Sequence, residues 1–110
     1  GVTYLTSSDY RLKENVDYDF TALDRVAQLK PARFNFIADA DTTVDGFIAH
    51  EVQDIIPEAI TGEKDAVDDE GNPVMQGIDQ SKLVPLLTKA IQEQQAQIET
   101  LTARVEQLEN

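Results

Sequence analysis

Residues 81–110 read SKLVPLLTKAIQEQQAQIETLTARVEQLEN, and this stretch decides the architecture of the chain. Apolar side chains recur in it with a seven-residue period at two positions. The first position is filled by Val84, Ile91, Ile98 and Val105, and the second by Leu87, Gln94, Leu101 and Leu108. Four heptads with one polar exception and no glycine predict a long coiled-coil helix. Pro85 must lie in its first turn, where a missing N–H costs little.

The heptad stripe also predicts association between copies of the chain. A strict two-position seam is too narrow and too long for a lone helix to bury against a small core. We therefore expect residues 81–110 to hold several copies together. β-Branched residues at the first position with leucine at the second favour two strands, whereas Gln94 can shift that choice. The helix alone leaves dimer and trimer open.

Composition narrows the possible functions. The chain has 110 residues, which is enough for one modest core, and its aromatic content of 6% predicts a mainly aliphatic one. The absence of cysteine excludes a disulfide scaffold and thiolate metal sites. A formal net charge of −12 repels phosphate backbones and anionic lipid, and no apolar run reaches the ~20 residues that span a bilayer. We expect no nucleic-acid or membrane partner, no cofactor and no metal.

Two helices and a strand are expected between the N-terminal segment and residue 57. Residues 1–19 are polar and read as extended chain and turns. Thr21 and Asp24 have the spacing of a capping box, before a helix that Pro31 ends. Residues 32–37 alternate between apolar and polar, which predicts a half-buried strand.

A turn and a second helix are expected next. The pair Asp45-Gly46 is typical of a turn. After it, Ile48, Val52, Ile55 and Ile56 lie on one face of a short helix that Pro57 ends.

Residues 58–80 differ in character, since seven acidic residues meet a single lysine. A strong turn signal lies at 71–73, and the apolar content is too low for the segment to fold alone. We predict that it forms an extended, solvent-projecting hairpin or arm, called the acidic arm below. Its Asp68–Asn72 cluster lacks the ligand spacing of a calcium loop and is expected to be a solvated turn. The fold class is therefore α+β, with short strands and helices, this arm and the long coiled-coil helix.

Ser8 and Lys13, five residues apart, are the residues of greatest chemical interest. A serine hydroxyl becomes a good nucleophile when a base removes its proton, and a lysine can be that base when it is neutral. A serine and a lysine in a polar segment are more often plain surface residues, so the spacing alone is a weak signal.

A family resemblance strengthens the signal. The run SDYRLKENV at 8–16 resembles the opening of the C-terminal intramolecular chaperone and autocleavage domain of phage tailspikes, endosialidases and tail fibres; a related domain lies in the myelin regulatory factor. The similarity continues through LDRVAQLKPARFNF, GFIAHEVQDIIPEAI and SKLVPLLTKAIQEQQAQIETL. The resemblance implies a homotrimeric α+β domain that helps a β-rich N-terminal passenger fibre to fold. The domain then releases itself as a single-turnover serine peptidase.

Site residues follow from the resemblance by position. Ser8 matches the nucleophile and Lys13 the general base, so the scissile bond is Ser7–Ser8. Asp9 and Arg11 match positions expected to support the loop. Residues 1–7 would be the end of the passenger, 8–80 the chaperone and cleavage region with its arm at 58–80, and 81–110 the trimerising helix. Gln80 departs from the family pattern, which has an aromatic residue there.

Several expectations remain open at this point. Glu51 could orient Lys13, whereas the single histidine, His50, is expected to be structural. The resemblance implies action in the host cytoplasm during virion assembly, and release from the mature fibre after cleavage. The alternative is a permanent, non-catalytic trimerisation cap or a receptor-binding fibre tip.

Overall fold

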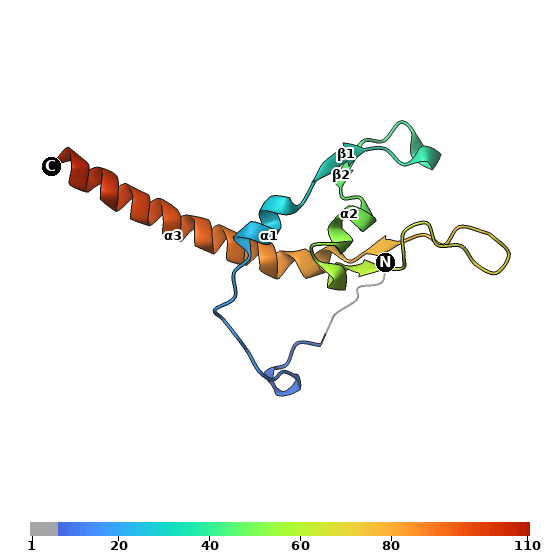
Figure 1. Ribbon diagram of the computed structural model, residues 1–110, viewed down its shortest axis with the longest axis horizontal. Helices are drawn as coiled ribbons and strands as arrows, with labels where there is room; N and C mark the ends of the chain where they lie inside the picture. Colours follow the sequence, from blue (N-terminus) through green and yellow to red (C-terminus); the bar gives the residue numbers. More distant parts are fainter. Residues whose placement is uncertain (1–6) are drawn as a thin grey trace.

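The computed structural model describes residues 7–110, and its shape is extended (Figure 1). The principal extents are 71 × 42 × 30 Å and the Cα radius of gyration is 19.5 Å. A compact chain of this length would have a radius near ~13 Å. Four parts project from a small centre (Figure 1). They are the helix α3 (Val84–Glu109), the loop that precedes α1 (Leu23–Gln28), the pair of strands that follows α1, and a long hairpin at 58–80. Of the predicted passenger end at 1–7, only Ser7 lies within the described residues.

The centre is a small aliphatic core, as the composition predicts. Its buried members come from the segment before α1, from the helix α2 (Ala49–Gln53) and the turn after it, from the turn that precedes α3, and from the start of α3. They are Ala22, Val52, Ile56, Ala59, Leu83, Leu86 and Ala90. The helix α2, Ala49–Gln53, presents Val52 to this core, and Ile56 follows just before Pro57 opens the 3₁₀ turn η3, Pro57–Ala59. The predicted short helix is confirmed with its buried Val52, but it ends at Gln53 rather than at Pro57, so Ile55 and Ile56 lie beyond it, and Ile48 is exposed at its N-cap.

The helix α1, Leu23–Gln28, is shorter than predicted and begins differently. Its N-cap is Ala22, and no side chain of its own neighbourhood caps it, so the predicted Thr21–Asp24 capping box is wrong. The cap comes from α3 instead, because the Glu93 carboxylate accepts hydrogen bonds from the backbone N–H groups of Ala22 and Leu23 at 2.6 and 3.2 Å. Free N–H groups at a helix start favour such an anionic acceptor.

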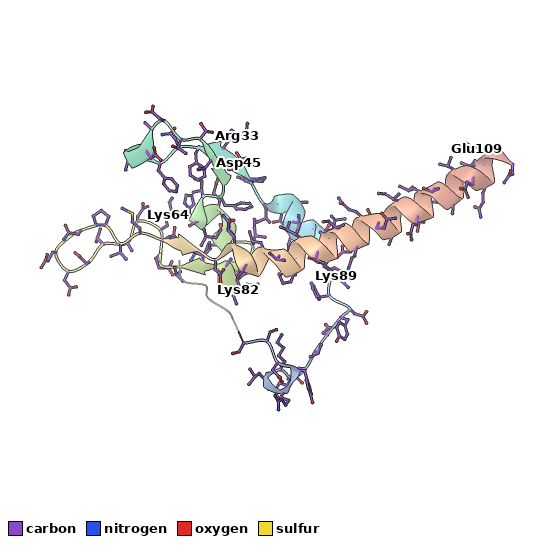
Figure 2. The ribbon with its side chains drawn as sticks, turned by 180° about the vertical axis from the view of Figure 1, so that it is seen from behind. Arg33, Asp45, Lys64, Lys82, Lys89 and Glu109 are labelled. Carbon is purple, nitrogen blue, oxygen red and sulfur yellow. The ribbon has the colours of Figure 1, made fainter. Side chains whose placement is uncertain are left out.

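The strand β1, Ala32–Phe34, pairs antiparallel with β2, Val44–Gly46. The predicted strand is confirmed for three residues, but the predicted turn at Asp45-Gly46 is wrong because both residues lie inside β2. Asp45 faces Arg33 across the pair and forms a bidentate ion pair with it, Nε to Oδ1 at 2.8 Å (Figure 2). A Cβ on Gly46 would lie 3.2 Å from the Phe34 ring, which accounts for glycine in the strand.

Residues 58–80 form the predicted projecting hairpin (Figure 1). Its base is the pair β3, Ile60–Thr61, with β4, Gly77–Ile78. The amide of Gln76 donates to Gln53 Oε1 at 3.0 Å, which holds the base against α2. A bridge between Val67 and Pro73 narrows the arm before its tip, where Asp68 Oδ1 accepts the backbone N–H groups of Glu70 and Asn72.

The 3₁₀ turn η4, Gln80–Leu83, leads into α3, Val84–Glu109, with Pro85 in the first turn as predicted. One face of α3 packs on its own chain through Leu86, Ala90 and Glu93. The heptad seam lies about 100° around the helix from that face. Its apolar members are between 40% and 87% exposed, and Gln94 is exposed too.

The mixture of helix and strand with a long C-terminal helix agrees with the predicted fold class. The coiled coil and the homotrimer stay predictions.

Candidate active site

The loop that precedes α1 carries the predicted nucleophile and base. Its centre is the 3₁₀ turn η1, Tyr10–Leu12, in which Lys13 N–H donates to the Tyr10 carbonyl at 3.1 Å. Asp9 caps this turn by accepting the backbone N–H of Arg11 at 2.9 Å. The Arg11 guanidinium also donates to both oxygens of Asp9, at 2.9 and 3.1 Å. Asp9 and Arg11 therefore hold the turn together, and their supporting role in cleavage stays a prediction.

The turn brings Ser8 and Lys13 together. The Lys13 ammonium donates to Ser8 Oγ at an Nζ–Oγ distance of 2.5 Å. With the amine neutral, the same approach lets the hydroxyl donate its proton to Nζ. Both residues are exposed, and Ser8 lies at the edge of a hollow of about 610 Å³ that Lys82, Pro85 and Leu86 also line. The pair has the contact that a serine–lysine dyad requires.

The charges beside the dyad are arranged by the Asp9–Arg11 pair. The hydrogen bond from the Arg11 side chain, followed by that from its backbone N–H, holds the pKa of Asp9 below its ordinary value. The same ion pair raises the pKa of Arg11. Because the Arg11 guanidinium forms a bidentate ion pair with Asp9, the Asp9 carboxylate neutralises its charge. The dyad is thus flanked by an ion pair with no net charge.

Other predicted site residues lie elsewhere. Glu51 lies in α2 and its carboxylate is 3.9 Å from Lys30 Nζ, and no contact within residues 7–110 joins it to Lys13. His50 is half-buried beside the base of the arm and lines a hollow with Glu63 and Met75. Gln80, where the resemblance led us to expect an aromatic residue, is exposed at the start of η4.

Between residues 7 and 110, no three His, Asp or Glu side chains are grouped closely enough to hold a metal ion. No helix in that range is both long and apolar enough to cross a bilayer.

Two residues that hold the loop could not be found by sequence reasoning. Lys89 Nζ donates to the Tyr18 carbonyl at 2.6 Å and lies 5.3 Å from the centre of the Phe20 ring. Glu93 caps α1. Both lie off the heptad seam, where charged residues ordinarily face solvent, so no local signal distinguishes them.

Comparison with known proteins indicates the family to which this part of the chain belongs. Residues 8–61 match the model of a family described as the chaperone of endosialidase, which carries the name of a peptidase family. The match begins at Ser8, the predicted nucleophile. Residues 8–61 belong to this family, and the resemblance inferred from the sequence is confirmed.

The chain is also similar to long tail fiber proteins of two phages. It is 33% identical over 107 residues to the long tail fiber protein Gp37 of Enterobacteria phage K3, and equally similar to that of Enterobacteria phage T2. Each alignment covers 94% of this chain, which spans only 8% and 7% of the length of those two relatives.

Proposed function

We propose that this chain is an intramolecular chaperone of a phage tail fibre that assembles as a trimer through α3 and then releases itself by cutting the Ser7–Ser8 bond. The observation that carries the proposal is the 2.5 Å contact between Lys13 Nζ and Ser8 Oγ, at the residue where the family match begins. The similarity to long tail fiber proteins indicates the class of passenger.

The exposed seam of α3 supports the assembly step. Ile91, Ile98 and Leu108 are 66%, 55% and 87% exposed in the single chain, although they form one continuous stripe. Three copies joined along this stripe would bury it, and would raise the effective concentration of three passenger ends. Non-local β assembly is slow because loop-closure entropy must be overcome before strands pair. Prior association of the ends removes part of that cost.

The cleavage step uses the dyad on the bond that precedes it. Neutral Lys13 takes the proton of Ser8 Oγ, and the oxygen attacks the carbonyl carbon of Ser7. The resulting ammonium returns the proton to the Ser8 nitrogen as the C–N bond breaks. The product is an ester between the Ser7 acyl group and Ser8 Oγ, with a free amine on Ser8. Because nucleophile and carbonyl are on adjacent residues, proximity can lower the barrier by several kcal/mol, ~7–11 at best.

Water then opens the ester. Its oxygen adds to the Ser7 carbonyl carbon, the C–Oγ bond breaks, and the Ser8 hydroxyl recovers a proton. The passenger ends in the Ser7 carboxylate and the chaperone begins at Ser8. Loss of the chaperone after assembly would leave the fibre kinetically trapped in its folded trimer.

The alternative is a permanent cap or receptor-binding tip that never cuts. It predicts the same assembly, since the α3 seam serves both, but it assigns no role to the Ser8–Lys13 contact. The two functions therefore differ in the final covalent state of the fibre.

The chaperone role is tested by joining the chain to a trimeric, β-rich tail-fibre segment placed before residue 1. We expect soluble trimeric passenger from the complete fusion, and aggregated passenger when residues 8–110 are removed. The matched control is the fusion with Ile91→Asp and Ile98→Asp, which keeps the whole domain but disrupts the seam. Equal yields of trimeric passenger from all three proteins would contradict the chaperone role.

A further inference from the structure

The cleavage loop makes few contacts with the rest of the molecule. Within the described residues, the single hydrogen bond that joins 7–20 to the remainder of the chain runs from Lys89 Nζ to the Tyr18 carbonyl, at 2.6 Å. In Figure 2, Lys89 lies where the segment that leads from the loop meets α3. The rest of the loop has little to pack on, since Tyr10 and Tyr18 are each 81% exposed.

Lys89 makes a second contact with the same segment. Its ammonium lies 5.3 Å from the centre of the Phe20 ring, within the range of a cation–π interaction. The Lys89 side chain is half-buried, in contrast to the exposed Lys13 and Lys82. Phe20 also lines the hollow that Ser8 borders, together with Pro85 and Leu86 of α3. One lysine thus holds both the backbone and the aromatic side chain of the segment after the dyad.

Lys89 lies on the same turns of α3 as the seam that is expected to join copies of the chain. It lies between Leu87 and Ile91, two residues of the exposed seam, on the opposite side of the same helical turns. When the seam is joined, these turns of α3 become fixed. A loop attached to them through Lys89 becomes fixed as well.

We propose that Lys89 is a positioning residue for autocleavage, which holds the Ser8–Lys13 loop on α3 so that assembly of the helices orders the dyad. This inference rests on the proposed function. Lys89 does not touch the reacting atoms, and its action passes through Tyr18 and Phe20. A loop held by one anchor is sensitive to its loss, because misplacement of reacting groups by about 1 Å can slow a reaction ~100-fold.

The test compares cleavage by the 110-residue chain with that by its Lys89→Met and Lys89→Arg variants. Methionine keeps an unbranched, apolar side chain but loses the donor and the charge, whereas arginine can donate to the carbonyl and lie over the ring. Lys64→Met, on the arm, is the control for loss of one positive charge. Intact mass spectrometry follows the loss of residues 1–7 with time at several pH values, and light scattering and thermal melting are measured on the same samples.

We expect Lys89→Met to slow cleavage between ~10-fold and ~100-fold at every pH, without a change in the shape of the pH profile. The molar mass and melting temperature of Lys89→Met should match those of the parent chain. Lys89→Arg should recover most of the cleavage rate, and Lys64→Met should be cleaved at the same rate as the parent chain. A cleavage rate in Lys89→Met equal to that of the parent chain would overturn the positioning role and leave the proposed function standing.

Equal slowing in Lys89→Met and Lys89→Arg with lower melting temperatures would also overturn the positioning role, since that pattern indicates a general structural role. A changed pH profile would instead mean proton transfer by Lys89. A parent chain that never lost residues 1–7 would contradict both this inference and self-cleavage.

Discussion

The Glu93 carboxylate on α3 accepts the backbone N–H of Ala22 at 2.6 Å, although 71 residues separate them in the chain. The same carboxylate accepts the N–H of Leu23 at 3.2 Å. α1 is therefore capped by the helix on which it packs. This contact fixes the chain immediately after the cleavage loop, one turn along α3 from Lys89.

Replacing Glu93 with alanine removes the cap of α1. The loss of an N-cap costs ~0.5–2 kcal/mol, which in a domain of this size lowers the melting temperature by about 2–16 °C. Alanine is the best helix former, so the change should not weaken α3 itself. Differential scanning calorimetry of Glu93→Ala checks this. Glu99→Ala is the matched control, because Glu99 contacts only Gln95 of its own helix among the described residues; an equal fall in both variants would contradict the capping role.

Charges placed in the α3 seam should dissociate the assembly. In the variant with Ile91→Asp and Ile98→Asp, each joined copy would bury two carboxylates beside those of its neighbours, which is strongly unfavourable. We expect light scattering to give a trimer mass for the parent chain and a monomer mass for the variant at micromolar concentration.

The control for that experiment uses the opposite side of α3. Ala96→Asp with Ala103→Asp adds the same charges at the same seven-residue spacing, at exposed positions away from the seam. This protein should remain trimeric. A monomeric parent chain, or equal dissociation of both variants, would contradict assembly through the seam.

The sequence predicted those features that depend on local periodicity. The α3 heptads, the buried Val52 of α2 and the acidic hairpin can be predicted because residues near one another in the chain determine them. The cap of α1 was missed because its acceptor, Glu93, is distant in the chain. The Asp45-Gly46 pair was misread as a turn because its position is set by pairing with Arg33 and by the approach of the Phe34 ring. At the site, the spacing of Ser8 and Lys13 was visible, whereas the Lys89 anchor was not.

The acidic arm is expected to contact the passenger. The base is fixed by Gln53 and Gln76, so the tip can be removed without disturbing the core: residues 67–73 are replaced by Asn-Gly, a two-residue turn suited to a hairpin. We expect the trimer mass to be unchanged and the yield of folded passenger to fall several-fold in the fusion described above. An unchanged yield would mean that the arm only connects β3 to β4.

The start of α3 should loosen in acid through Asp79. This residue caps η4 by accepting the Ser81 hydroxyl at 2.6 Å and the Ser81 N–H at 3.1 Å, and these bonds hold its pKa below the ordinary value. A lowered folded-state pKa means that the stabilisation is complete above the unfolded pKa, near ~3.9, and is lost as pH falls through the folded one. The melting temperature of the parent chain should exceed that of Asp79→Asn at neutral pH, and the difference should shrink below pH ~4. A difference that grows in acid would contradict the assignment.

The rate of cleavage should depend on pH through the Lys13 amine. Neutral Lys13 is the base, so the fraction of competent dyads grows as protons are removed, and the rate should rise with pH. Measuring the half-time of fragment release between neutral and mildly alkaline pH checks this, in the range where the trimer mass stays constant. A rate that falls with pH would exclude a lysine base.

Self-cleavage by the dyad is tested most directly by mass spectrometry of the parent chain and of the variants Ser8→Ala, Lys13→Met and Lys13→Arg. The mass of each product shows at which residue it begins. The parent should yield a fragment that begins at Ser8. All three variants should stay uncut while remaining trimeric, since alanine lacks the nucleophile, methionine lacks the base, and a guanidinium stays protonated. Release of a fragment beginning at residue 8 from Ser8→Ala would contradict self-cleavage by the dyad and would indicate an external protease.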